Sequence, residues 1–270
     1  MNRLDRAFTG KRKPLIAYLC VGDPTVDESV DLALACIRAG ADILELGVPY
    51  SDPAADGPVI ARAGARAIAA GGGLEATLRV ARSIRAAQPD VGLLLFGYYN
   101  PIYIRGELRT AADAAEAGID ALLIVDLPAE EGAELRAAAA ARGLGIVPLL
   151  TPTSSPARVA AAREAATRAP APFVYYVSVM GITGTTALNA SGAGARAGAL
   201  RAEMGRPVVV GFGVDSRAKA RDTARQADGV VVGTALVRVI EQGATAPERL
   251  AAAERLIRDL RAGMDEAQAG

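Results

Sequence analysis

The stretch A-D-I-L-E-L-G-V-P-Y-S-D-P-A-A-D-G-P-V-I-A-R-A-G, residues 41–64, combines the two features on which the fold depends. Its first part is an apolar run of the kind that forms a buried strand, and one acid, Glu45, interrupts it. The loop that follows is rich in Pro, Gly and Asp and carries two more acids, Asp52 and Asp56. A carboxylate in a buried strand costs free energy unless it is paired or used. The pattern therefore indicates acid–base chemistry at a strand end, with a structural acid followed by ordinary Asx turns as the alternative.

The same unit, an apolar run followed by an Ala-rich helical stretch, repeats along the chain. Apolar runs predict eight strands, at 14–20, 42–48, 92–98, 121–125, 145–150, 173–177, 207–210 and 228–232. Helical spacing predicts helices at 1–8, 26–39, 58–71, 74–87, 106–117, 130–142, 156–168, 193–204, 216–226, 234–241 and 246–262. Apolar strands that alternate with helices are typical of a parallel sheet covered by helices.

Eight such units in 270 residues predict an α/β protein with one domain, a (β/α)8 TIM barrel over residues 1–270. The helices at the N-terminus and after strands two and eight are extra to the basic pattern. A doubly wound open sheet is the alternative, but the first strand-to-helix turn lacks the G-x-G-x-x-G fingerprint of that fold.

The composition excludes several kinds of site. The chain has no histidine, which rules out His-based triads and His-ligated metals, and we expect no metal. The two cysteines, Cys20 and Cys36, fit no metal-binding spacing and are expected to be reduced packing residues, with a catalytic thiol at Cys20 as the less favoured reading. Lys+Arg and Asp+Glu are both 30, so no basic excess points to nucleic acid or an anionic membrane. With no signal-peptide pattern and no apolar span, a cytoplasmic location is expected.

In a barrel, the segments that follow the strands meet at one rim, and the active site lies there. Glu45 is late in its strand and is expected to point into the barrel, because pointing outward would bury its charge against apolar helices. Asp56, in the next loop, can fold over the same mouth.

The late strands end in glycine-rich loops at 181–185, 211–213 and 233–235. Glycine loops expose backbone N–H groups, and the last one opens a short predicted helix whose dipole favours an anion. These loops contain no Lys or Arg, so a phosphate would be held by amides and by the Thr234 hydroxyl. Aromatic residues also gather in or after strands, which suits a flat apolar ligand at the mouth: Tyr18, Phe96, Tyr98, Tyr175 and Phe212.

Several motifs resemble one family across essentially the whole chain. They are G-D-P at 22–24, E-L-G-V-P-Y-S-D-P-A-A-D-G-P at 45–58, Y-N-P-I at 99–102, D-L-P at 126–128, G-I-T-G at 181–184, G-F-G-V at 211–214 and G-T-A-L-V at 233–237. Their order and spacing are similar to those of the tryptophan synthase alpha chain. The second motif, in which an aspartate follows the glutamate by eleven positions, is the most specific.

The resemblance implies a lyase that cleaves indole-3-glycerol phosphate to indole and glyceraldehyde 3-phosphate in tryptophan biosynthesis. It implies that Glu45 is the general acid–base, that Asp56 stabilises charge at the indole nitrogen, and that Tyr175 supports the glutamate. The expected substrate- and phosphate-binding residues are Thr183, Gly184, Phe212, Gly213, Gly233 and Thr234. The expected indole pocket is Tyr18, Phe96, Tyr98 and Ile60.

The expected partner is a tryptophan synthase beta chain in an α2β2 tetramer, with pyridoxal phosphate on the beta chain alone and no cofactor on this one. Three alternatives stay open at this stage. One is a free-standing indole-3-glycerol phosphate lyase, and another is a non-catalytic barrel that binds or activates a partner. The third is a different phosphate-binding barrel enzyme, which would need a Lys or Cys near the mouth; the three lysines, at 11, 13 and 219, are not at carboxyl ends of predicted strands.

Overall fold

The computed structural model describes residues 3–10, 12–169, 171–177, 190–211 and 213–269. The strands of this part are β1 (Leu15–Cys20), β2 (Ile43–Gly47), β3 (Gly92–Gly97), β4 (Ala121–Ile124), β5 (Gly145–Ile146), β6 (Leu149–Leu150), β7 (Val174–Val177), β8 (Val208–Gly211) and β9 (Gly229–Val232). Its helices are α1 (Arg3–Thr9), α2 (Val26–Ala39), α3 (Pro58–Ala69), α4 (Leu74–Ala87), α5 (Tyr99–Arg105), α6 (Glu107–Glu116), α7 (Ala133–Ala140), α8 (Pro156–Arg168), α9 (Ala190–Met204), α10 (Arg217–Gln226), α11 (Thr234–Gln242) and α12 (Ala246–Ala269).

The strands form one parallel sheet in the order β5-β4-β3-β2-β1-β9-β8-β7-β6, so its two edge strands are consecutive in the chain. They are the halves of the single fifth strand predicted at 145–150. The N–H of Val147 donates to Leu122 O at 2.9 Å on one side, and the N–H of Tyr175 donates to Pro148 O at 3.0 Å on the other. Pro148 has no N–H to offer, so the ladder is interrupted there. The segment nevertheless joins both edges, and the predicted barrel is confirmed.

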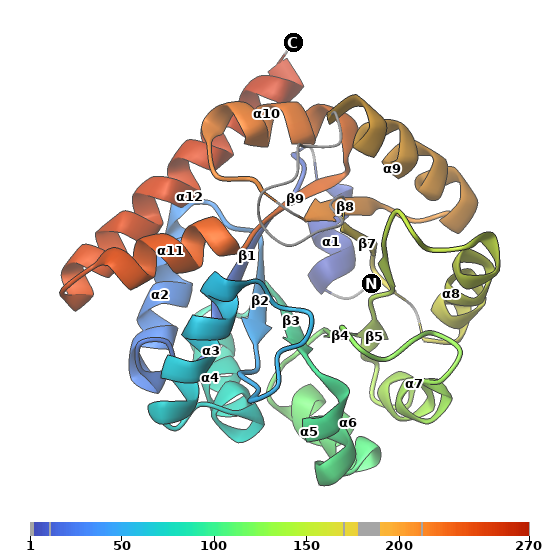
Figure 1. The fold of residues 1–270 in the computed structure, drawn as a ribbon, viewed down its shortest axis with the longest axis horizontal. Coiled ribbons are helices and arrows are strands. Elements are labelled where there is room, and N and C mark those ends of the chain that lie inside the picture. Colours follow the sequence, from blue (N-terminus) through green and yellow to red (C-terminus); the bar gives the residue numbers. More distant parts are fainter. Residues whose placement is uncertain (1–2, 11, 170, 178–189, 212, 270) are drawn as a thin grey trace.

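Side chains alternate between two environments along each strand. Those of Leu44 and Leu46 pack outward with the surrounding helices, and that of Ile43 packs with side chains inside the barrel. Figure 1 shows the strands at the centre of the view with the helices around them.

Helix α1 closes the amino-terminal end of the barrel and corresponds to the helix predicted at 1–8. Leu4 belongs to the interior cluster, and the rings of Phe8 and Phe173 lie 5.3 Å apart. Gly92 leaves room for Leu4, since a Cβ at position 92 would lie 2.6 Å from Leu4 Cδ2.

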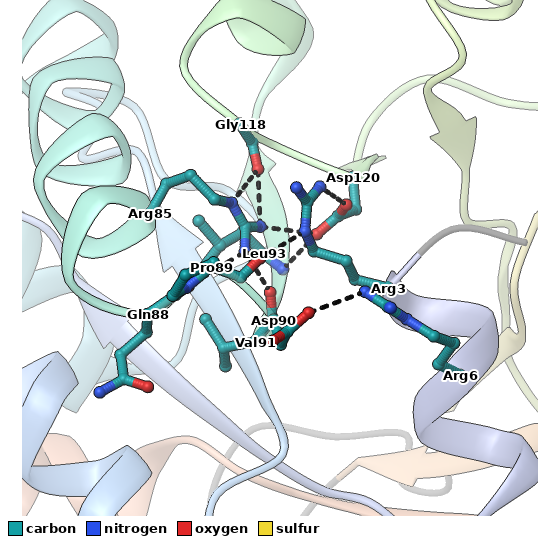
Figure 2. Close-up of polar contacts among 10 residues, drawn as sticks. All are labelled: Arg3, Arg6, Arg85, Gln88, Pro89, Asp90, Val91, Leu93, Gly118 and Asp120. Atoms are coloured by element: carbon teal, nitrogen blue, oxygen red, sulfur yellow. Dashed lines mark hydrogen bonds and ion pairs between the residues drawn. The ribbon is translucent and has the colours of Figure 1, made fainter.

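Ion pairs fix this helix to the barrel. Figure 2 shows Arg3 and Arg85 converging on Asp120, at 3.0 and 2.9 Å, and Arg6 reaching Asp90 at 3.2 Å. Asp120 is 4% exposed and also accepts the backbone N–H of Leu93 at 2.9 Å. A buried carboxylate with this many donors is fully compensated, and it holds the closed end together.

Four helices differ from the sequence prediction, and one of them, α9, begins at Ala190 instead of 193. Helix α5 was not predicted, because its first turn is stabilised from another strand end: the Asp126 carboxylate accepts the N–H of Tyr99 at 2.7 Å. Helix α7 begins at Ala133, not at 130, because the N–H groups of Glu131 and Gly132 are turned toward Pro128 O. Helix α12 continues past 262 to Ala269. None of the helices in the described ranges is long and apolar enough to span a membrane.

Candidate active site

Glu45 lies in β2, paired in register with Tyr18 on β1 and Leu94 on β3. Strand alternation gives it the same face as Ile43, so its side chain enters the barrel interior. It is 1% exposed, and within the described residues its Oε1 has no hydrogen-bond partner. Burial raises its pKa to about 8. The carboxyl group is therefore protonated at neutral pH and holds a proton that it can donate.

Tyr175 lies on β7 inside the same barrel and is 9% exposed. Burial, and then the charge of Glu45, raise its pKa well above the usual value, which places the two side chains in the same low-dielectric space. The Tyr175 hydroxyl occupies the position that a Cβ on Gly211 would take. The glycine that ends β8 therefore makes room for this tyrosine.

Asp56 lies in the loop between β2 and α3 and is half-buried. Burial raises its pKa to about 6, and a side-chain hydrogen bond with Tyr98 limits the rise. The Tyr98 hydroxyl also accepts the N–H of Ala55 at 3.0 Å, and its ring lies 5.1 Å from that of Tyr50. Tyr98 thus fixes the loop that carries Asp56, which is ionised at neutral pH.

Three of the side chains predicted to bind the indole ring pack together near these acids. Tyr18 and Phe96 meet edge-on, with ring centroids 5.4 Å apart, and Ile60 packs in the same cluster. The Tyr18 ring lies over Gly47, where a Cβ would collide with it. Burial raises the Tyr18 pKa first, and the charges of Cys20, Asp56 and Glu45 raise it further. Both predicted acids are therefore within electrostatic reach of this ring.

The glycine loops after β8 and β9 lie on the same rim. Gly213 has φ +70°, a left-handed conformation that favours glycine. Gly233 precedes α11, and Thr234 is the exposed first residue of that helix, whose N-terminal N–H groups are free to face an anion. Gly233 also lies next to Tyr18, since a Cβ there would lie 3.7 Å from Tyr18 Cβ. Three predicted binding residues, Thr183, Gly184 and Phe212, lie outside the described residues.

Sequence reasoning missed the residues that hold α3, the helix that follows the Asp56 loop. Arg66 on α3 donates to both carboxylate oxygens of Asp23, each at 2.8 Å, and to Glu241 at 2.7 Å. Arg62 pairs with Glu241 as well, at 2.9 Å. Asp23 is 5% exposed and precedes Pro24 in the G-D-P motif, but no local sequence pattern marks its pairing with Arg66.

Other chemistry finds no support in the described part of the chain. Burial raises the pKa of Cys20 to about 12, so its thiol is not poised as a nucleophile. Among the described residues, no three His, Cys, Asp or Glu side chains gather into a group that could hold a metal ion.

Comparison with known proteins gives a single family. The family model "Tryptophan synthase alpha chain" matches residues 4–267. The tryptophan synthase alpha chain of Citrifermentans bemidjiense is 44% identical over 256 residues, covering 93% of this chain and 94% of the relative. That of Laribacter hongkongensis is 42% identical over 270 residues, covering 98% and 100%. The crystal structure of tryptophan synthase subunit alpha from Legionella pneumophila has a TM-score of 0.91 at 34% identity, covering 98% of this chain and 99% of that one.

Proposed function

The chain belongs to the tryptophan synthase alpha chain family and is a lyase, and from this premise we propose that it cleaves indole-3-glycerol phosphate to indole and glyceraldehyde 3-phosphate. The observation that carries the proposal is Glu45, a carboxyl group with a pKa of about 8 that enters an otherwise apolar barrel. The reaction needs a group that gives a proton and takes one back near neutral pH, and this pKa suits both steps.

In the proposed mechanism, Glu45 donates its proton to C3 of the indole ring. Asp56, as a carboxylate, accepts a hydrogen bond from the indole N–H and stabilises the positive charge that develops there. Glu45, now ionised, takes the proton of the adjacent glycerol hydroxyl. The bond between indole C3 and the glycerol carbon then breaks, its electron pair returns to the ring, and the hydroxyl-bearing carbon becomes an aldehyde. The proton that Glu45 takes from the hydroxyl replaces the one that it gave to C3. Glu45 thus returns to its starting state, and the proposed cycle uses no cofactor or metal on this chain.

The pocket residues fit the two ends of this substrate. Tyr18, Phe96 and Ile60 offer a flat apolar surface for the indole ring, and Tyr98 holds the Asp56 loop beside it. We assign the phosphate to the amides of Gly213, Gly233 and the start of α11, and to the Thr234 hydroxyl, with Thr183, Gly184 and Phe212 completing the site. Tyr175 would position Glu45 rather than react.

The partner that the family implies is a tryptophan synthase beta chain. We propose that it receives the indole, carries the only pyridoxal phosphate, and completes an α2β2 tetramer in the cytoplasm. Three large hydrophobic side chains are unusually exposed: Tyr103 on α5 at 68%, Ile104 on α5 at 76% and Leu108 on α6 at 77%. They follow β3 at the same rim as the acidic loop at 52–57, and we assign this surface to the beta chain.

Indole release from indole-3-glycerol phosphate, with and without a beta chain, tests the proposal. We expect slow release by the isolated chain and a large stimulation by the partner. Leu108→Asp should abolish the stimulation while Ile68→Asp, at an exposed isoleucine of α3, should keep it. Equal rates with and without a beta chain would favour the free-standing lyase, and no release in either condition would favour a non-catalytic barrel.

A further inference from the structure

A cavity of about 220 Å³ lies between α7, α8 and the ends of β4, β5 and β6. Ile124 and Ile146, at the ends of β4 and β5, form part of its floor, and both pack with the cluster between the strands and the surrounding helices. The alanines of α8 form one wall. Its polar lining comes from other positions: Arg136 on α7, Arg158 on α8, and Thr151 and Ser154 in the loop between β6 and α8. None of these residues belongs to the candidate active site.

Arg136 is a partly buried cation without compensation. In the described part of the chain its guanidinium makes no hydrogen bond or ion pair, and its Nε is fully buried. Burial lowers the pKa of Arg136, the charge of Arg168 lowers it further, and only Glu130 acts in the opposite direction. A Cβ on Gly132 would lie 3.0 Å from Arg136 Nη1, so the glycine makes room for the guanidinium. An unpaired charge that is partly buried costs free energy, and a bound anion would reduce that cost.

The rest of the lining also suits an anion. Among the described residues, the Arg158 guanidinium is engaged only by a long ion pair to Glu130, at 3.7 Å. The Ser154 hydroxyl accepts the N–H of Thr151 at 3.0 Å and lies 3.4 Å from the Thr151 hydroxyl, with which it shares a proton unless a ligand takes that bond. The cavity has one carboxylate, Asp126, which accepts the N–H of Tyr99 at 2.7 Å and is outnumbered by the two guanidinium groups. Two guanidinium groups and a hydroxyl donor match the oxygens of a tetrahedral oxyanion.

We propose that this cavity binds a phosphate group, held by Arg136 and Arg158, at a site separate from the barrel mouth. The chemistry is common to free phosphate and to the phosphate end of a small monoester. Binding removes the unpaired charge of Arg136, so occupancy stabilises α7 and α8 against the barrel. The site is independent of lyase activity, because no residue of the proposed mechanism lines it.

Thermal unfolding and calorimetric titration with inorganic phosphate test the proposal in three proteins: wild type, Arg136→Gln and a control, Arg163→Gln. The control removes an exposed arginine of α8 that does not line the cavity. Without phosphate, Arg136→Gln should unfold at or above the wild-type temperature. Phosphate should raise the midpoint of wild type and the control but raise that of Arg136→Gln much less. Affinity at this site should fall about tenfold or more in Arg136→Gln. Titration with glycerol 1-phosphate in place of inorganic phosphate shows which source binds more tightly.

The mouth should also bind phosphate if the proposed function is right, so the site must be located. Selenate soaked into crystals, and found by its anomalous scattering, should lie between Arg136 and Arg158 in wild type and be absent there in Arg136→Gln. Indole release should be unchanged in that variant. Selenate at the mouth alone, an equal phosphate response in all three proteins, or a lower midpoint of Arg136→Gln without phosphate would overturn the proposal and leave the lyase assignment intact.

Discussion

The Tyr175 hydroxyl lies where a Cβ on Gly211 would have to be, so the glycine that ends β8 is matched to the tyrosine on β7. At the end of β2, a Cβ on Gly47 would likewise collide with the ring of Tyr18 on β1. Glycines at these strand ends therefore accommodate aromatic rings inside the barrel, in addition to any role of the neighbouring loops in phosphate binding.

Gly211→Ala should displace Tyr175 and, with it, the surroundings of Glu45. We expect kcat for indole release to fall on the order of 10- to 100-fold, because small displacements at a reacting centre have large effects. Gly92→Ala is the matched control: it creates a similar clash with Leu4 at the closed end of the barrel and should lower stability without changing kcat of the folded protein. A normal kcat in Gly211→Ala would show that the position of Tyr175 is unimportant.

The pKa values of Glu45 and Asp56 predict a bell-shaped pH profile of kcat/KM. Asp56 must be ionised and Glu45 protonated in the free enzyme, so the limbs should lie near pH 6 and pH 8. The substrate phosphate also titrates near pH 6, and Asp56→Asn separates the two contributions. In that variant the acidic limb should weaken and shift while the basic limb stays. An unchanged acidic limb would remove Asp56 from the mechanism.

Glu45 also predicts a pH-dependent cost in stability. Its pKa is raised from 4.5 to about 8 on folding, so the folded state holds the proton more tightly than the unfolded state. Wild-type stability should fall as pH rises from about 4.5 through 8, because the unfolded carboxyl ionises first. Glu45→Gln has no group that ionises at this position and so does not lose stability in this way. In urea titrations, the free energy of unfolding of Glu45→Gln should exceed that of wild type by an amount that grows from near zero at pH 4.5 to on the order of a few kcal/mol above pH 8. A constant difference across this range would contradict the raised pKa.

Arg66 predicts a separate effect on the Asp56 loop. Arg66→Gln leaves the buried Asp23 carboxylate without its two donors and should destabilise the protein by about 1–3 kcal/mol. It should also raise KM, because α3 follows the loop that carries Asp56. Arg62→Gln, which removes only the exposed contact with Glu241, should do neither. Equal effects of the two changes in urea titrations and KM would mean that Asp23 does not depend on Arg66.

The sequence allowed the barrel and the inward position of Glu45 to be predicted because both follow from local pattern. Apolar runs marked the strands, and the two-residue period placed Glu45 on the inner face with Ile43. Pro148 divided a correctly predicted strand without moving it.

The missed features depend on residues that are far apart in the chain. Helix α5 begins where Asp126 receives the Tyr99 N–H, and α3 is held by Asp23, more than forty positions away from Arg66 in the chain. The cavity between α7 and α8 likewise depends on Arg136 and Arg158, which come from two different helices and line the same space. No local pattern encodes such contacts, so they become visible only in the folded structure.

The central claim is that Glu45 carries the proton chemistry, and Glu45→Gln tests it most directly because the amide keeps the shape of the side chain and loses the proton exchange. Indole release and substrate binding should be measured on the same preparation, with a beta chain present. We expect near-complete loss of indole release with nearly unchanged affinity for indole-3-glycerol phosphate. Substantial indole release by Glu45→Gln would contradict it.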